Sequence, residues 1–123
     1  VPENESLFMS RVPVLEPPNI MYERTQLDAS MLLGYRKSYI DTLIAEEAEL
    51  GAAFSEQNWT TLRAIINRLE KSSLYVGTLQ IGLASTWLKE VLTMDSEHSE
   101  KITHYYQLLN ETIKNTLDTI IHY

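Results

Sequence analysis

Proline is confined to the beginning of this 123-residue chain, where all four prolines lie before residue 20. Because proline has no amide donor and clashes with the preceding helical turn, residues 1–18 are predicted to be an extended linker or arm. Apolar side chains in this segment, such as Leu7, Phe8 and Met9, favour an arm that packs on the domain. Residues 19–123 contain no proline and are free to form long helices.

Apolar residues after residue 19 recur at three- and four-residue spacing, which is typical of helices with one buried face. The spacing predicts five helices, at about 19–27, 29–54, 59–76, 78–92 and 97–121. Asn58 suits the N-cap of the third helix because its side chain can accept a backbone hydrogen bond. Gly77 suits its end because glycine readily adopts the left-handed conformation. Trp59 and Leu69 are expected to be buried.

Short connections between the predicted helices imply antiparallel neighbours. The predicted fold class is therefore all-α: an antiparallel up-and-down four-helix bundle with an extra short N-terminal helix and the extended N-terminal arm. Residues 1–18 then form the linker or packed arm, and residues 19–123 form the helical bundle domain. The chain begins with Val1 rather than methionine, so we expect it to be an excised piece of a larger protein.

The composition argues against several classes of partner. A formal net charge of −7 disfavours binding to nucleic acid and to anionic membranes. No apolar run approaches the length of a bilayer span, so no membrane contact by this domain is expected. Cysteine is absent, which excludes thiolate chemistry and agrees with a reducing compartment.

Three histidines, His98, His104 and His122, are candidates for metal binding or catalysis. Glu100 and His104 are spaced to share one helix face, but a tight metal site needs three or four ligands. The sequence has no Ser-His-Asp pattern, no glycine-rich phosphate loop and no zinc motif. We therefore predict no metal site, no cofactor and no catalytic residue.

The segment from Asn58 to Gly77 carries the most specific pattern in the chain. It resembles the signature helix of histidine-containing phosphotransfer (HPt) domains, which reads acidic residue and Trp, then Leu, then His-x-Leu-Lys-Gly-Ser-Ser, then a glycine ten residues after the histidine. The positions that match in register are Trp59, Leu62, Leu69, Ser72, Ser73 and Gly77, followed by Ile81, Ala84 and Leu88 in the next helix. The resemblance covers roughly Leu15 to the C-terminus.

The departures from the family pattern are concentrated at the site. Asn67 stands at the position of the phosphorylated histidine, Glu70 at that of a lysine, and Lys71 at that of a glycine. The amide of Asn67 has no nucleophilic nitrogen, since its lone pair is delocalised into the carbonyl. Glu70 would repel phosphoryl oxygens that a lysine would stabilise. Three changes together indicate a natural, catalytically silent relative rather than an engineered one.

The resemblance implies a signalling module of a bacterial two-component phosphorelay, in the position of a C-terminal domain of a hybrid sensor kinase. Such a module would not be an enzyme and would bind a response-regulator receiver domain or a histidine kinase domain. The expected docking face comprises Arg63, Asn67, Glu70 and Lys71. The expected state is a monomer in the cytoplasm, either free or as the cytoplasmic part of a membrane-anchored sensor kinase.

Two alternatives remain open at this point. The domain could transfer phosphoryl groups through another histidine, or it could be a purely structural helical interaction module. Each site residue also has a simpler interpretation. Asn67 could be an ordinary polar surface residue, Glu70 and Lys71 a solvated pair, and Ser72 and Ser73 small residues that allow close helix packing.

Overall fold

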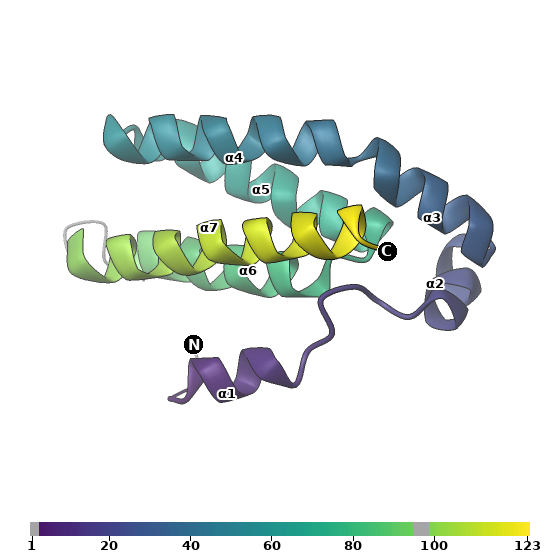
Figure 1. The fold of residues 1–123 in the computed structure, drawn as a ribbon. Coiled ribbons are helices and arrows are strands. Elements are labelled where there is room, and N and C mark those ends of the chain that lie inside the picture. Colours follow the sequence, from purple (N-terminus) through teal and green to yellow (C-terminus); the bar gives the residue numbers. More distant parts are fainter. Residues whose placement is uncertain (1–2, 95–98) are drawn as a thin grey trace.

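The computed structural model describes residues 3–94 and 99–123, which form helices joined by turns and irregular segments, without any strand (Figure 1). The fold class is all-α, as predicted. The helices of the described part are α1 (Glu5–Ser10), α2 (Pro18–Thr25), α3 (Ala29–Ser38), α4 (Ile40–Ser55), α5 (Trp59–Val76), α6 (Leu79–Met94) and α7 (Ser99–Ile121).

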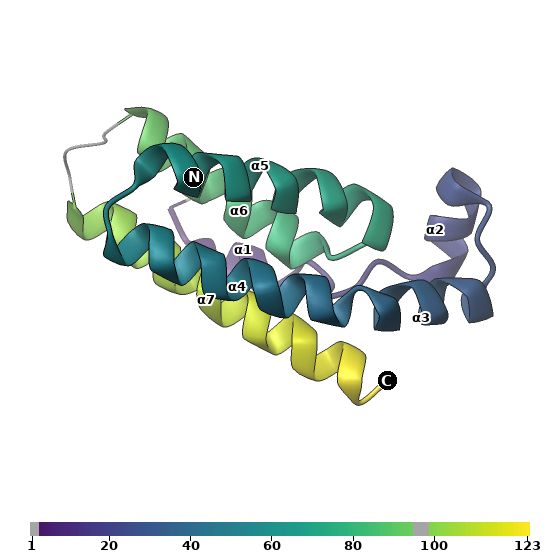
Figure 2. The same cartoon turned by 90° about the horizontal axis from the view of Figure 1, so that it is seen from above.

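The four long helices α4 to α7 pack around one apolar core. Helix α5 contacts α4 and α6, and α7 contacts the same two helices. The smaller α3 continues the direction of α4, with α2 folded beside it, near the end of α7 (Figure 2). The core is formed by aliphatic side chains from all four long helices, chiefly Leu43, Leu50, Leu62, Ile65, Ile66, Leu69, Ile81, Ala84, Leu88, Ile102, Leu109 and Ile113.

Helix α5 has the bounds that the sequence predicts. The Asn58 side chain accepts a hydrogen bond from the amide of Thr61 at 3.2 Å, and Gly77 ends the helix with φ of 77°. Leu69 is fully buried, as predicted. Trp59 is only half-buried, so that prediction was wrong. It is the first residue of α5, and its ring packs on Phe54 at the end of the core, which leaves one edge in solvent.

The N-terminal arm is not wholly extended, contrary to the prediction. Residues 5–10 form α1, because the four prolines lie outside this stretch and the Asn4 side chain caps it through the amide of Leu7. The arm does pack on the domain: Met9 is buried with the core residues. Gln80 of α6 donates hydrogen bonds to the carbonyl oxygens of Met9 and Val12, at 3.3 and 2.7 Å.

The helix predicted over 29–54 is interrupted at Tyr39, which separates α3 from α4. The Tyr39 amide donates to the carbonyls of both Tyr35 and Arg36, at 3.2 and 3.1 Å. This shared bond tightens the turn locally and breaks the regular α-helical ladder. Helix α2 starts at Pro18, which the sequence analysis assigned to the arm, since proline is well suited to the first turn of a helix.

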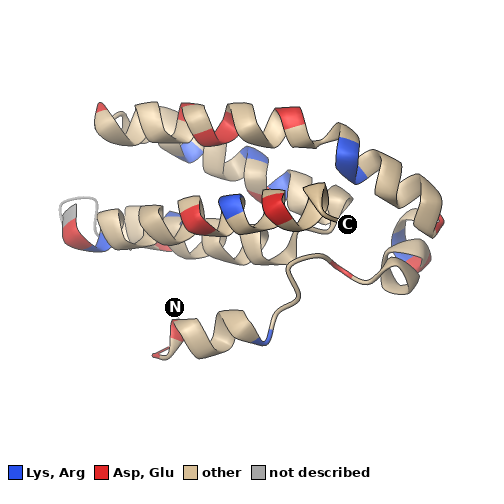
Figure 3. Ribbon diagram, in the orientation of Figure 1, with Lys and Arg blue, Asp and Glu red and all other residues tan. Residues whose placement is uncertain are grey.

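Charged side chains are distributed over all the long helices (Figure 3). Helix α4 is acidic on the side that faces α5, where Arg68 binds Glu49 at 2.8 Å and lies 3.8 Å from Glu46. Within the described ranges, none of the helices combines the length and the apolar character needed to cross a membrane. His98 lies outside the described residues.

Candidate functional site: a groove between α5 and α6

Asn67 is exposed on α5 and lies on the rim of a groove of about 630 Å³. Helices α5 and α6 form the two long walls, and α1 with the residues after it closes one side. The lining residues are Asn67, Glu70, Lys71, Ser73 and Leu74 from α5, Leu79, Gly82, Leu83, Thr86 and Lys89 from α6, and Phe8, Val12 and Arg24 from the N-terminal part.

The groove brings together three of the four residues that were predicted to form a docking face. Asn67, Glu70 and Lys71 all line it. Arg63 does not, because its guanidinium reaches across to the end of α6 and donates to the Leu92 carbonyl at 3.2 Å. Arg63 lies one turn before Asn67 on α5, but it does not line the groove.

Glu70 is held by α6 rather than presented to solvent. One carboxylate oxygen accepts from Lys89 Nζ at 2.9 Å, and the other accepts from the Thr86 hydroxyl at 2.8 Å. The simpler interpretation of a solvated Glu70–Lys71 pair is therefore wrong. Lys71 is exposed, and no hydrogen bond or ion pair of its side chain is found in residues 3–94 and 99–123. Lys71 thus contributes a free positive charge to the rim.

The floor of the groove is formed where α5 and α6 approach each other closely. Ser73 is buried, and its hydroxyl donates to the Glu70 carbonyl at 2.7 Å. A Cβ atom on Gly82 would lie only 2.6 Å from that hydroxyl oxygen. Ser73 and Gly82 are thus small because the helices touch there. Ser72 has another role: its hydroxyl shares a 2.6 Å hydrogen bond with the Tyr39 hydroxyl.

Apolar side chains form much of the lining of the groove. Leu74 is 59% exposed and Phe8 is 47% exposed. The ring of Phe8 meets that of Trp87 edge-on, with centroids 6.1 Å apart. Phe8 and Val12 were not predicted to be parts of the site. The apolar run Leu7-Phe8-Met9 did indicate that the proline-containing arm packs on the domain.

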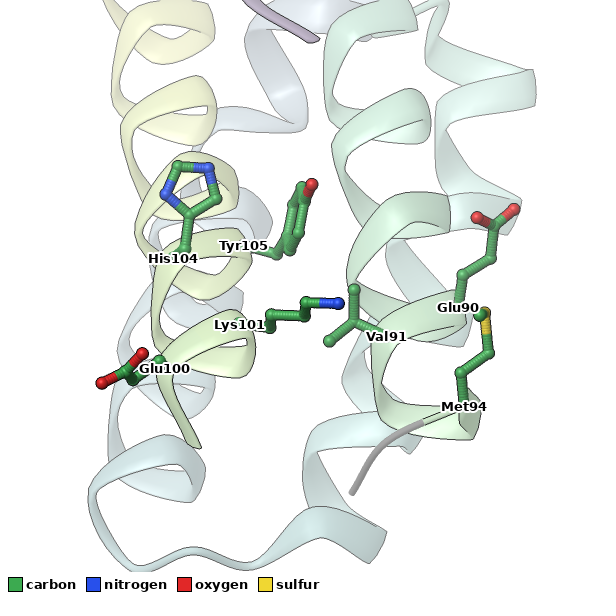
Figure 4. Close-up of a pocket in the computed structure, with 7 residues that line it drawn as sticks. All are labelled: Glu90, Val91, Met94, Glu100, Lys101, His104 and Tyr105. Carbon is green, nitrogen blue, oxygen red and sulfur yellow. The ribbon is translucent and has the colours of Figure 1, made fainter. Parts of the chain in front are cut away.

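A second hollow, of about 490 Å³, lies between α6 and α7 beside His104 (Figure 4). Glu100 and His104 both line this hollow, as their spacing on one helix face suggests, but the His104 ring pairs with Glu5 of α1. Burial raises the pKa of Glu5, but hydrogen bonds with Tyr105 and His104 outweigh it and lower that pKa below its ordinary value. Burial and the bond to Glu5 raise the pKa of Tyr105 to about 12.

His122 is the other histidine among the described residues. His122 is exposed and lies 3.1 Å from the Asp118 carboxylate, one turn earlier in α7. Among the described residues, no group of three or more histidine, aspartate or glutamate side chains is arranged to hold a metal ion.

The polar side chains that line the groove carry amide, hydroxyl, carboxylate and cationic groups. Asn67 offers an amide, Ser73 is buried and bonded to its own helix, and Glu70 is bound by Thr86 and Lys89. The Thr86 hydroxyl lies within hydrogen-bond reach of a potential base, the Glu70 carboxylate, which Lys89 also binds. No family model, curated protein or solved structure matches the chain.

Proposed function

We propose that the chain is a phosphotransfer-silent, HPt-like signalling module that binds a receiver or histidine kinase domain through the α5–α6 groove. One observation carries this proposal. The positions of α5 that match the family scaffold, such as Leu62, Leu69 and Ser73, are buried, whereas Asn67 is exposed at the rim of a groove. The resemblance implies the same arrangement for a helix that carries a phosphohistidine: its scaffold positions are buried and its site position is exposed.

The packing of the long helices supports the family architecture. Consecutive helices α4, α5, α6 and α7 contact each other in turn, and α7 returns to α4. Only residues 56–58 join α4 to α5, and only 77–78 join α5 to α6. Connections this short favour antiparallel neighbours. We therefore interpret the four long helices as an antiparallel up-and-down bundle.

The groove indicates the chemistry of its partner. Its centre is apolar, with Phe8, Leu74 and Leu83, and its rim carries the free charge of Lys71. Glu70 adds little negative charge to the rim, because Lys89 binds its carboxylate. A protein surface with an apolar centre and an acidic edge would complement it, and the acidic phosphorylation pocket of a receiver domain provides such an edge.

Binding is tested by titrating a panel of receiver and kinase domains from the organism that encodes the chain, with isothermal titration calorimetry as the readout. Leu74→Asp should weaken binding at least tenfold, because it places a charge at the apolar centre of the groove. Tyr75→Asp is the matched control: Tyr75 is 64% exposed, is the next residue of α5, and does not line the groove. Equal loss in both variants, or no binding by any domain, contradicts the proposal.

Chemical silence is tested with the same domains after radiolabelling of their phosphorylated aspartate. The unmodified chain should take up no acid-labile label, because Asn67 has no nucleophilic nitrogen. Robust labelling of the unmodified chain would instead indicate transfer to a histidine such as His104. A His104→Asn variant distinguishes that outcome, since label lost in this variant would locate the phosphoryl group.

A further inference from the structure

A third cavity, of about 300 Å³, lies at the end of the molecule where α3 passes the C-terminal part of α7. Its walls are mostly aliphatic: Leu15, Pro18, Ala29, Leu32, Leu33 and Ile120. Ser30 and Tyr123 add polar atoms, and the guanidinium-bearing side chain of Arg36 completes the lining. This cavity is separate from the α5–α6 groove, with which it shares no lining residue.

Arg36 is unusual because it is only 4% exposed. Its Nε donates to the Val76 carbonyl at 2.8 Å, and its Nη2 donates to the Glu16 carbonyl at 2.7 Å. Gly77 makes room for it, since a Cβ there would lie 2.7 Å from Nη2. A guanidinium has five N–H groups. Two of them are used in this way, and the described residues provide no hydrogen-bond partner for Nη1.

The positive charge of Arg36 has no carboxylate partner within 4.0 Å in the described part of the chain. The carboxylate of Glu16 is bound by Arg24 instead. The carbonyl of Val76 belongs to the C-terminal end of α5, which carries about half a negative charge. Burial lowers the pKa of Arg36, and the charges of Tyr123 and Glu16 offset that effect only in part. An arginine side chain stays protonated at neutral pH.

A buried charge is costly unless an opposite charge or a full set of hydrogen bonds compensates it. A carboxylate meets both needs, because it can accept two parallel N–H bonds from one guanidinium edge. The aliphatic walls require that the rest of such a ligand be apolar. The volume, at the low end for small-molecule sites, limits that part to a short chain or one ring.

We propose that this cavity binds a small monocarboxylic acid, with the carboxylate on Arg36 and the apolar tail among Ala29, Leu33 and Ile120. Such a ligand would also stabilise the end of the molecule, because Arg36 joins α3 to the end of α5 and to the arm at Glu16. The proposal does not depend on signalling through the α5–α6 groove.

The test uses the full chain with octanoate as the probe and 1-octanol as its neutral counterpart of the same chain length. Calorimetry should show one saturable octanoate site per chain. Octanoate should bind about tenfold tighter than octanol or better, since hydrogen bonds to a charged group are the stronger kind. The melting temperature should rise with octanoate concentration. Equal affinity for the two probes, or no saturable binding, overturns the proposal.

A pair of variants locates the site without disturbing Arg36, whose removal could unfold this end of the protein. Ala29→Trp places a large side chain at the mouth of the cavity, from an exposed position of α3. It should weaken octanoate binding at least tenfold while the helical circular dichroism stays unchanged. Met31→Trp is the control, because Met31 is 55% exposed on the same helix and does not line the cavity. Unchanged octanoate affinity in Ala29→Trp also overturns the assignment.

Discussion

Replacing Gly82 with alanine should destabilise the protein, although alanine is usually the better helix residue. Gly82 lies within α6, where alanine would ordinarily stabilise by about 0.5–1 kcal/mol. The added Cβ, however, would lie 2.6 Å from the Ser73 Oγ and 3.2 Å from the Ser73 Cβ. Ser73 cannot easily move away, because it is buried and its hydroxyl is bonded to the Glu70 carbonyl.

The magnitude follows from the two opposing effects. Forcing an extra carbon into a packed interface costs about 1–3 kcal/mol. Subtracting the helix-propensity gain leaves a net loss of about 1 kcal/mol in the free energy of unfolding. Urea denaturation followed by circular dichroism measures this loss. The change should appear in the midpoint, with an unchanged slope.

Gly34 provides the matched control for Gly82→Ala. It lies in α3, and a Cβ added there would meet nothing within 4 Å. Gly34→Ala should therefore stabilise the protein by about 0.5–1 kcal/mol. In a Ser73→Ala background the hydroxyl is gone, and the cost of Gly82→Ala should shrink or reverse. If Gly82→Ala stabilises as much as Gly34→Ala does, the close approach of α5 and α6 is refuted.

Three further predictions concern the core and the buried acids. Leu69→Ala should lower the free energy of unfolding by about 2–5 kcal/mol, because Leu69 is fully buried, and a cost near zero in urea would show that this site is not core. Glu46 is 8% exposed, and one of its carboxylate oxygens has no partner. Burial raises the pKa of this carboxyl. The folded protein therefore loses stability as the pH rises through that raised value. Glu46→Gln should then stabilise the protein at pH 7 and flatten the pH profile of thermal melting, whereas destabilisation at pH 7 would contradict this. The pKa of Glu5 is lowered in the folded protein. The stability that the Glu5 carboxylate contributes is therefore present above the ordinary carboxyl range and is lost as the pH falls through the lowered value. Amide hydrogen exchange of residues 5–12 should therefore accelerate relative to the core at acidic pH, and a Glu5→Gln variant should lose this dependence.

Local signals explain why α5 was predicted to the residue. Asn58 and Gly77 each act on the backbone beside them, so their effect can be read from a few neighbouring letters. The break at Tyr39 has no such signal, because neither proline nor glycine stands there and the bond is shared between Tyr35 and Arg36. A periodic pattern alone therefore joined α3 and α4 into one helix.

Prediction of the candidate site was limited in the same way, because contacts between different helices leave no local signal in the sequence. Helical spacing places Asn67, Glu70 and Lys71 on one side of α5, and all three line the groove. Which partner each charge takes could not be predicted, because Lys89 and Leu92 reach Glu70 and Arg63 from another helix. Which side chains pair between two helices depends on how the helices pack. The sequence of one helix therefore does not determine its partners.

The contact between Phe8 and Trp87 gives the protein a built-in optical probe of its own arm. Trp87 is only 4% exposed, and the ring of Phe8 lies on it edge-on. A six-residue helix is marginal in isolation, so α1 should open at a much smaller free energy than the four long helices unfold. Such opening would change the emission of Trp87 and leave that of Trp59, which packs on Phe54, unaltered. In a Trp59→Phe background, fluorescence alone would then time the departure and return of the arm without any attached dye.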